Sequence, residues 1–175
     1  VVDIYKYIFE NTIPSNKMQD IIDNNKEYIV VTLHRRENRG DKMYSMWNQL
    51  NILSNKYKFI YITHPSLPDI KKILGDSNII LLDPQDYESM VHLIFNSKGI
   101  ITDSGGLQEE AVCAKKKVLV CRNTTERPET ISSGWGKLIH TNILNNIDFL
   151  DNSDNTSNTA GDDSIPRINP YGTNV

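Results

Sequence analysis

Short apolar runs alternate with helical patterns along most of this chain, from Tyr28 to His140. Each run is rich in β-branched residues and is followed by polar turn residues and then by apolar residues at helical spacing. Parallel strands need a crossover connection of this kind, and an all-parallel sheet is covered by helices on both faces. The alternation therefore predicts an α/β fold built on a doubly wound parallel sheet.

The predicted elements follow from the residue pattern. Strands are expected at residues 28–33, 59–63, 78–82, 99–102, 118–121 and 136–140. Helices are expected at residues 1–9, 18–22, 43–53, 70–74, 87–94 and 105–114, with a further helix opening at Pro128.

Polar residues gather directly after the predicted strands. In an open parallel sheet, ligands bind outside the carboxyl ends of the strands, so these residues are expected to meet at one rim. Connections alone could have used any turn residues, and one shared anionic, hydroxyl-rich ligand explains the pattern better. The strand ends in question are His34–Asn38, His64, Asp83–Gln85, Asp103–Gly106 and Arg122–Arg127.

The sequence Ser104-Gly105-Gly106 joins the fourth predicted strand to the following helix. Without a Cβ, a glycine lets a ligand approach the backbone closely, and the first amides of a helix have no intrahelical partner. Such helix starts attract anions, phosphate above all. Glu109 and Glu110, one turn further on, are well placed for sugar hydroxyls. The three residues alone are equally compatible with a structural tight turn, so the neighbouring motifs must decide.

His34 is a candidate phosphate contact or proton donor to a leaving phosphate, because it lies beside two arginines at the inferred anion site. A single histidine at a strand end can also be held simply by backbone hydrogen bonds. Neighbours in a strand point to opposite sides, so Arg35 and Arg36 cannot both face the site if the strand continues through them. One of them is expected to pair with Glu37 or with another carboxylate.

Three other strand-end residues have two interpretations each. Arg127 either reaches a phosphate or sugar of the ligand or belongs to an ordinary capped helix start at Pro128. Gln85 either reads a nucleobase edge with its amide or lies in a surface turn. His64 precedes Pro65 and is equally compatible with a strand terminator.

Composition restricts the partners. At 175 residues the chain is long enough for one domain with a buried core. Its net charge of -3 gives no general reason to expect nucleic acid or an anionic membrane, so any anion binding must be local. Cys113 and Cys121 fit neither metal-ligand nor Cys-x-x-Cys spacing and are expected to be reduced and buried in a cytoplasmic protein. No apolar run is long enough to span a bilayer.

Five motifs occur along the chain: His34-Arg35-Arg36-Glu37-Asn38, Asp83-Pro84-Gln85-Asp86-Tyr87, the run from Thr102 to Ala111, Thr124-Thr125-Glu126-Arg127-Pro128-Glu129, and Asn169-Pro170-Tyr171-Gly172. Together they resemble the non-hydrolysing UDP-N-acetylglucosamine 2-epimerases, with matching order and spacing from about Tyr28 to Ile139. The resemblance implies two Rossmann-like domains of the GT-B type with the active site in the cleft between them. This chain resembles only the carboxyl-terminal half.

The resemblance also implies the reaction. Members of this family interconvert UDP-GlcNAc and UDP-ManNAc: UDP is eliminated to leave a 2-acetamidoglucal and is then added back with C2 inverted, without metal, nicotinamide or other cofactor. The partners implied are the UDP-sugar substrate, an amino-terminal domain that is absent here, and a second copy in a homodimer of the full-length enzyme. The chain alone is therefore expected to bind UDP weakly and to be inactive.

Residue roles are carried over by position. His34 would be the catalytic or phosphate-contacting histidine, and Arg35, Arg36 and Glu37 would support it or contact phosphate. The substrate-binding residues would be Ser104, Gly105 and Gly106 at the diphosphate, Glu110 at the ribose hydroxyls, Gln85 and Met90 at the uracil, and Arg127 at the substrate.

The domain organisation expected on this basis has three segments. Residues 1–27 would be an interdomain helix and linker remnant, because the chain starts at Val1 rather than Met, residues 28–142 the UDP-binding domain, and residues 143–175 a polar, partly disordered tail.

This chain departs from the family pattern at several positions. Met90 stands where a uracil-stacking aromatic residue is usual, and Thr173-Asn174 stands where Asp-Gly is usual. Pro65 follows His64 directly, where some bacterial members have Asn-Pro after a regulatory histidine, which puts activation by a second UDP-GlcNAc in doubt. Two alternatives therefore stay open: a GT-B glycosyltransferase that uses a UDP-sugar, and a non-catalytic nucleotide-sugar binding module.

Overall fold

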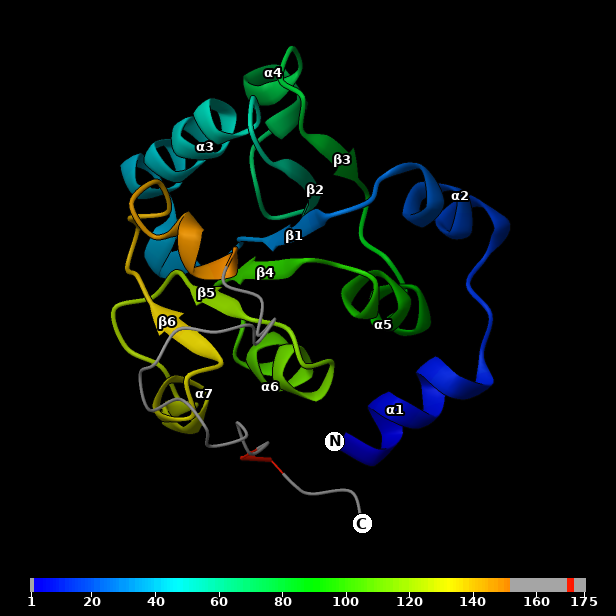
Figure 1. Ribbon diagram of the computed structural model, residues 1–175. Helices are drawn as coiled ribbons and strands as arrows, with labels where there is room; N and C mark the ends of the chain where they lie inside the picture. The colour runs from blue at the N-terminus through cyan, green and yellow to red at the C-terminus, as the bar shows by residue number, and fades with distance from the viewer. Residues whose placement is uncertain (1, 152–169, 172–175) are drawn as a thin grey trace.

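The computed structural model of the chain describes residues 2–151 and 170–171 (Figure 1). Its strands are β1 (Tyr28–Thr32), β2 (Lys58–Ile62), β3 (Ile80–Leu82), β4 (Gly99–Thr102), β5 (Val118–Val120) and β6 (Gly136–Leu138). Its α-helices are α1 (Val2–Asn11), α2 (Asn16–Asn24), α3 (Asp41–Leu53), α4 (Ile70–Leu74), α5 (Tyr87–Phe95), α6 (Gly105–Cys113) and α7 (Pro128–Ser132). Two 3₁₀ helices, η1 (Arg36–Asn38) and η2 (Ile147–Leu150), complete the described part.

The strands form one parallel sheet in the order β3-β2-β1-β4-β5-β6. The first strand, β1, lies in the middle of the sheet, and β2 and β3 follow on one side of it. The chain then returns and places β4, β5 and β6 on the other side of β1. This is the doubly wound arrangement that the alternating pattern predicted, and the direction of winding reverses between β1 and β4. A ligand crevice is expected at that reversal, outside the carboxyl ends of these two strands.

Helices cover both faces of the sheet (Figure 1). One face carries α3, α4 and η2, and the other carries α1, α2, α5, α6 and α7. No helix within the described part of the chain combines the length and apolarity needed to cross a membrane.

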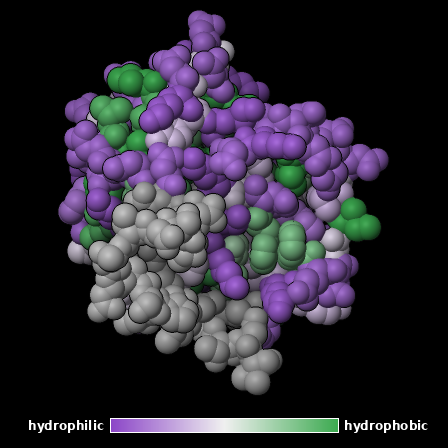
Figure 2. All heavy atoms as spheres, in the orientation of Figure 1, coloured by the Kyte–Doolittle hydropathy of each residue, from purple (hydrophilic) through white to green (hydrophobic). Residues whose placement is uncertain are grey.

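The core has two layers because successive strand residues point to opposite faces. In β1, Ile29 and Val31 pack with Trp47 of α3, whereas Val30 packs on the other side with α5 and α6. Both Trp47 and Val30 are buried. The visible surface outside the grey area is mostly hydrophilic, with apolar side chains in separate patches (Figure 2). Burial of the apolar strand faces therefore accounts for the main stabilisation of the fold.

The structure corrects the expectation of a polar tail for its first part. Ile143, Ile147 and Leu150 are buried and belong to the core layer that contains Trp47. Ile147 and Leu150 belong to η2, which contacts β5. The packed body therefore continues to residue 151, and residues 152–169 and 172–175 lie outside the described part.

The segment before β1 also packs on this body. Tyr5 of α1 and Met18 and Ile22 of α2 are buried in the core layer that contains Val30. Cys121 is fully buried as expected, but Cys113 is only partly buried, because it lies at the carboxyl end of α6.

Candidate functional site

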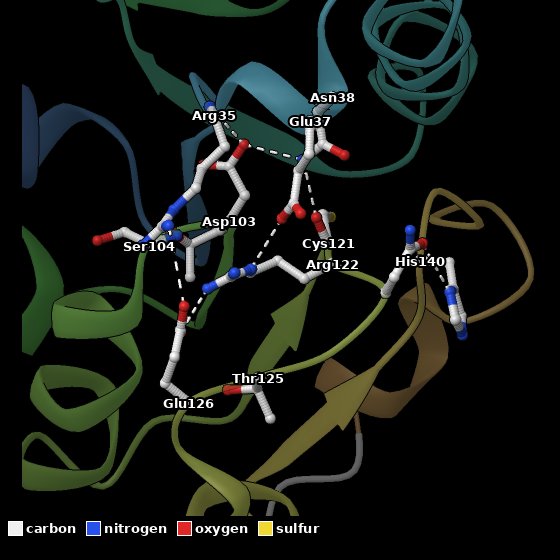
Figure 3. A network of polar contacts seen from close by, with 12 residues as sticks. Arg35, Glu37, Asn38, Asp103, Ser104, Cys121, Arg122, Thr125, Glu126 and His140 are labelled. Atoms are coloured by element: carbon white, nitrogen blue, oxygen red, sulfur yellow. Dashed lines mark hydrogen bonds and ion pairs between the residues drawn. The ribbon is translucent and has the colours of Figure 1, made fainter.

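Asp103, directly after β4, organises the rim at the point where the winding reverses (Figure 3). Its side chain is fully buried and accepts hydrogen bonds from the backbone amides of His34 (3.1 and 3.2 Å) and Arg35 (2.9 Å). It also accepts one from Asn38 Nδ2 (3.0 Å). Since His34, Arg35 and Asn38 all follow β1, one carboxylate fixes the whole loop after β1 against the end of β4.

Two further bonds fasten the ends of β1, β4 and β5 to one another. Asn38 Nδ2 also donates to the backbone oxygen of Cys121 after β5 (2.8 Å). The hydroxyls of Thr32 and Thr102, the last residues of β1 and β4, lie 2.7 Å apart, and Thr102 Oγ1 accepts from the Ser104 amide (3.0 Å). The carboxyl ends of the three central strands therefore form one rigid rim.

His34 lies half-buried on this rim, with its ring stacked on that of His64. The two ring centroids are 4.7 Å apart and the ring planes differ by 12°. His34 Nδ1 lies 3.9 Å from Asp103 Oδ1, and His64 Nδ1 accepts from the Ser66 amide (3.1 Å). Burial lowers the pKa of His34 below its usual value, His64 and Arg35 lower it further, and Asp103 opposes them. The ring therefore favours the neutral form at neutral pH.

We expect NMR titration of the imidazole groups to place the His34 pKa below that of an exposed histidine. Because the folded-state pKa is the lower one, the unfolded chain takes up the proton first as pH falls, so His34 opposes folding in acid. His64→Asn removes a like charge beside His34 and should raise the His34 pKa. His140→Asn is the control: His140 follows β6 and contacts Asn123, so its replacement should leave the His34 pKa unchanged. An unchanged His34 pKa in His64→Asn would contradict this account.

Two arginines and two glutamates continue the network toward α6 (Figure 3). The Arg122 side chain donates through Nε to Glu37 Oε1 (2.8 Å) and through Nη1 to Glu126. Glu126 also lies 3.9 Å from Arg35 Nη1. The hydrogen bond from Arg122 lowers the pKa of Glu126, so its carboxylate is ionised at neutral pH.

The glycine pair opens α6 beside this network. A Cβ built on Gly105 would lie 3.5 Å from Glu126 Oε2 and 3.9 Å from Arg35 Nη2, and one built on Gly106 would meet no described atom within 4 Å. Ser104 is the N-cap residue, but within the described residues its side chain makes no capping hydrogen bond. Its hydroxyl, the Gly106 surface and the first amides of α6 are therefore available to a ligand.

Arg127 and the two glutamates of α6 form the other side of the site. Arg127 donates through Nε to Glu109, and its amide donates to Thr125 Oγ1 (3.0 Å). Thr125 in turn donates to Gln108 Oε1 (2.7 Å), which ties the loop after β5 to α6. Glu110 is half-buried, and burial together with Glu109 raises the pKa of Glu110 to about 7.

The structure brings some of the predicted site residues together and leaves others apart. His34, Arg35, Glu37, Ser104 and Gly105 share the network shown in Figure 3 or border it directly. Glu110 lies on α6, and Arg127 lies beside this helix, where it binds Glu109.

The other predicted residues lie elsewhere. Gln85 donates its amide to the backbone oxygen of Asp83 (2.7 Å), as a surface turn residue does. Met90 of α5 is partly buried against the core layer that contains Val30, and Arg36 is exposed. These three side chains stay candidates for a site role on sequence grounds.

The family follows from comparison with known proteins. A family model described as UDP-N-acetylglucosamine 2-epimerase matches residues 1–174. The chain belongs to this family. UDP-N-acetylglucosamine 2-epimerases of Yersinia pestis and Campylobacter jejuni are 40% and 42% identical to it over 158 and 125 residues. These alignments take in 86% and 67% of this chain but only 42% and 33% of the relatives, so the chain spans less than half of their length.

Solved structures of the epimerase family agree with the fold. The S. aureus MnaA structure with UDP is 34% identical, has a TM-score of 0.75 and matches 87% of this chain and 44% of its own. The UDP-GlcNAc 2-epimerase of Neisseria meningitidis bound to UDP-GlcNAc is 32% identical, with a TM-score of 0.72 over 83% of this chain and 44% of its own. A glycosyl transferase domain from Francisella tularensis, 16% identical with a TM-score of 0.57, shares the fold alone.

Sequence reasoning missed the residues that hold the epimerase-family motifs together. Asp103 and Asn38 were recognised as parts of motifs but not as the centre of the rim, and Glu126 was not expected at the glycine pair. One signal was available for Asp103: an acidic residue directly after a fully apolar strand must find several donors if it is buried. No comparable signal marks Glu126, because one of its partners, Arg35, lies far away in the sequence in the loop after β1, and the other, Arg122, lies in the same loop as Glu126.

Proposed function

We propose that this chain is the UDP-binding part of a UDP-N-acetylglucosamine 2-epimerase, acting on UDP-GlcNAc and UDP-ManNAc. The observation that supports it best is the glycine pair at the start of α6, which opens at the winding reversal beside His34 and Arg35. A helix start with accessible amides suits a diphosphate. Relatives that match most of this chain were solved with UDP and with UDP-GlcNAc.

In this proposal Ser104, Gly105 and Gly106 contact the diphosphate, and Glu110 accepts hydrogen bonds from the ribose hydroxyls. Gln85 and Met90 take the uracil, and Arg127 lies at the substrate. Gln85 would have to exchange its bond to Asp83 for one to the base, since its amide is occupied in the structure. The groups that move the C2 proton of the sugar would lie on a second domain, so that the chain binds UDP but does not turn over UDP-GlcNAc alone.

His34 is the proposed catalytic residue of this part. Its Nδ1 lies 3.9 Å from Asp103 Oδ1, and in this proposal Nε2 is the nitrogen that addresses the leaving phosphate. A diphosphate next to the ring adds negative charge and raises the pKa that burial lowers, which favours the imidazolium form. As the bond between C1 and the phosphate oxygen breaks, the imidazolium can donate a proton to that oxygen, and the same proton returns when UDP adds back.

Alanine at the glycine pair tests the proposal directly. Gly105→Ala and Gly106→Ala place a methyl group where a ligand would approach, and we expect each to weaken UDP binding about tenfold or more in calorimetry. Neither Cβ would meet a described atom closer than 3.5 Å, so both variants should fold. Alanine should also stabilise the helix by up to about 1 kcal/mol relative to glycine.

Gly40→Ala provides the matched control. Gly40 has φ +77° and no described atom within 4 Å of an added Cβ, so alanine there strains the backbone without crowding anything. This variant should lose stability and keep its UDP affinity, the reverse of the two α6 variants. Undiminished UDP affinity in both Gly105→Ala and Gly106→Ala would refute the proposed site.

A further inference from the structure

The arginines around the glycine pair are already paired with carboxylates. Arg122 pairs with Glu37 and Glu126, Arg35 approaches Glu126, and Arg127 pairs with Glu109. Such pairing cancels most of the positive potential that an anionic ligand would otherwise meet. A diphosphate that approaches these arginines therefore meets the charge of the carboxylates that pair with them.

Glu126 is the carboxylate placed to be replaced. Among the carboxylates of the described residues, it is the one that contacts Arg35 and Arg122 and also lies against the Gly105 position, 3.5 Å from a Cβ built there. Its side chain is 52% exposed, whereas that of Glu109 is 16% exposed and that of Asp103 is fully buried. Glu126 also lies in the loop between β5 and α7, so its side chain can turn outward without moving a strand or helix.

We propose that Glu126 is a built-in counterion of the anion site, whose carboxylate competes with the ligand's phosphates for Arg35 and Arg122. This inference rests on the proposed function. Glu126 pairs with both guanidinium groups at the start of α6, and the incoming diphosphate takes its place beside Arg35 and Arg122 as the carboxylate turns to solvent. Glu126 is thus a positioning residue that also sets how much negative charge a ligand must bring.

Glu37 differs from Glu126 although both bind Arg122. Glu37 belongs to η1, whose neighbours are fastened by Asp103, and its bond reaches Arg122 from the side of β1. Among the described contacts it touches neither Arg35 nor the Gly105 position. Removing the charge of Glu37 should therefore free one side of Arg122 but leave Glu126 in place at the start of α6. Glu37→Gln is for this reason the matched comparison.

The test compares Glu126→Gln, Glu37→Gln and the unchanged protein by calorimetry with UDP, pyrophosphate and uridine. Glutamine keeps the size and a hydrogen-bonding oxygen while removing the competing charge. We expect Glu126→Gln to bind UDP and pyrophosphate about twofold to fivefold more tightly, the range set by a partly exposed ion pair. Affinity for uridine, which carries no phosphate, should not change. Glu37→Gln should not tighten either anionic ligand.

Urea unfolding of each variant separates a charge effect from a change of fold. Unchanged or weaker binding of UDP by a folded Glu126→Gln variant, with the unchanged protein binding UDP, would overturn the counterion role and leave the proposed function in place. Equal tightening by Glu37→Gln would also overturn it, because the effect would then be one of net charge. If the unchanged protein binds neither UDP nor pyrophosphate, the proposed function and this inference fall together.

Discussion

Replacing Asp103 by alanine should lower the free energy of unfolding by about 3–5 kcal/mol, because several buried or half-buried donors lose their acceptor at once. The donors are the amides of His34 and Arg35 and the Asn38 side chain. The Asp103 side chain is completely buried, so water cannot replace the lost oxygen atoms without rearrangement. Urea unfolding followed by circular dichroism measures the change.

Asp103→Asn is the informative companion to this variant. Asparagine keeps one oxygen acceptor and the side-chain volume, but it places an amide donor against the amides that Asp103 accepts from. It should cost less than Asp103→Ala, although still more than about 1 kcal/mol. A loss below about 1 kcal/mol in Asp103→Ala would show that the loop after β1 is held by other contacts.

The sheet could be predicted from sequence because each strand is a continuous apolar run with its own boundary. Val30, Ile100 and Val118, for example, stand in β-branched runs that end in polar residues, and all three are buried in the sheet. The structure confirms the doubly wound order, and each predicted strand is present with an end shifted by at most a few residues. Such shifts are small because strand ends depend on local pairing rather than on the apolar pattern.

The segment after β6 could not be assigned in the same way. Ile143, Ile147 and Leu150 are separated by asparagine and aspartate, and the polar composition outweighed their spacing. Their burial depends on packing against β5 and the core layer that contains Trp47, which no local pattern reveals. Tertiary packing, not propensity, determines this part of the chain.

In the candidate site, the sequence predicted where residues lie but not which side chains they pair with. The rule that ligands lie beyond the carboxyl ends of parallel strands placed His34 and Ser104 on one rim, which the structure confirms. The partners of the arginines did not follow from that rule. The strand does not continue through these two residues, because the chain turns into η1 at Arg36. Arg35 pairs with Glu126 across the rim, so one of the two arginines does pair with a carboxylate as expected, but the rule did not indicate which one.

Glu110 gives the second large effect, with opposite signs for stability and for binding. Its pKa is raised to about 7 by burial and by Glu109, whereas in the unfolded chain it returns to an ordinary glutamate value. Between about pH 4.5 and 7 the folded chain therefore holds a proton that the unfolded chain has lost, so stability falls as pH rises through that window. From about pH 8 upward both states are ionised and the loss is complete.

Glu110→Gln removes that loss because the amide carries no charge. We expect the variant to be more stable than the unchanged protein by about 2–3 kcal/mol at pH 8 and nearly equal to it at pH 4.5, measured as the difference between urea unfolding curves. Taking the difference cancels the titration of all other groups. A stability gain that does not depend on pH would mean that the carboxylate is not the titrating group.

The same variant should bind UDP about tenfold more weakly at pH 8, because the proposed bonds from the ribose hydroxyls lose a charged acceptor. Binding by the unchanged protein should strengthen between pH 6 and 8, as Glu110 ionises, and that dependence should vanish in Glu110→Gln. Glu109→Gln is the comparison that removes a neighbouring charge but keeps the Glu110 carboxylate. It removes a charge that helps to raise the Glu110 pKa and also removes the partner of Arg127, but it keeps the proposed ribose contact. A half-buried carboxylate lowers stability at a pH where it is ionised, and such a cost is expected where the charge serves a ligand. A gain of stability together with a loss of UDP binding in Glu110→Gln would therefore identify Glu110 as a binding residue.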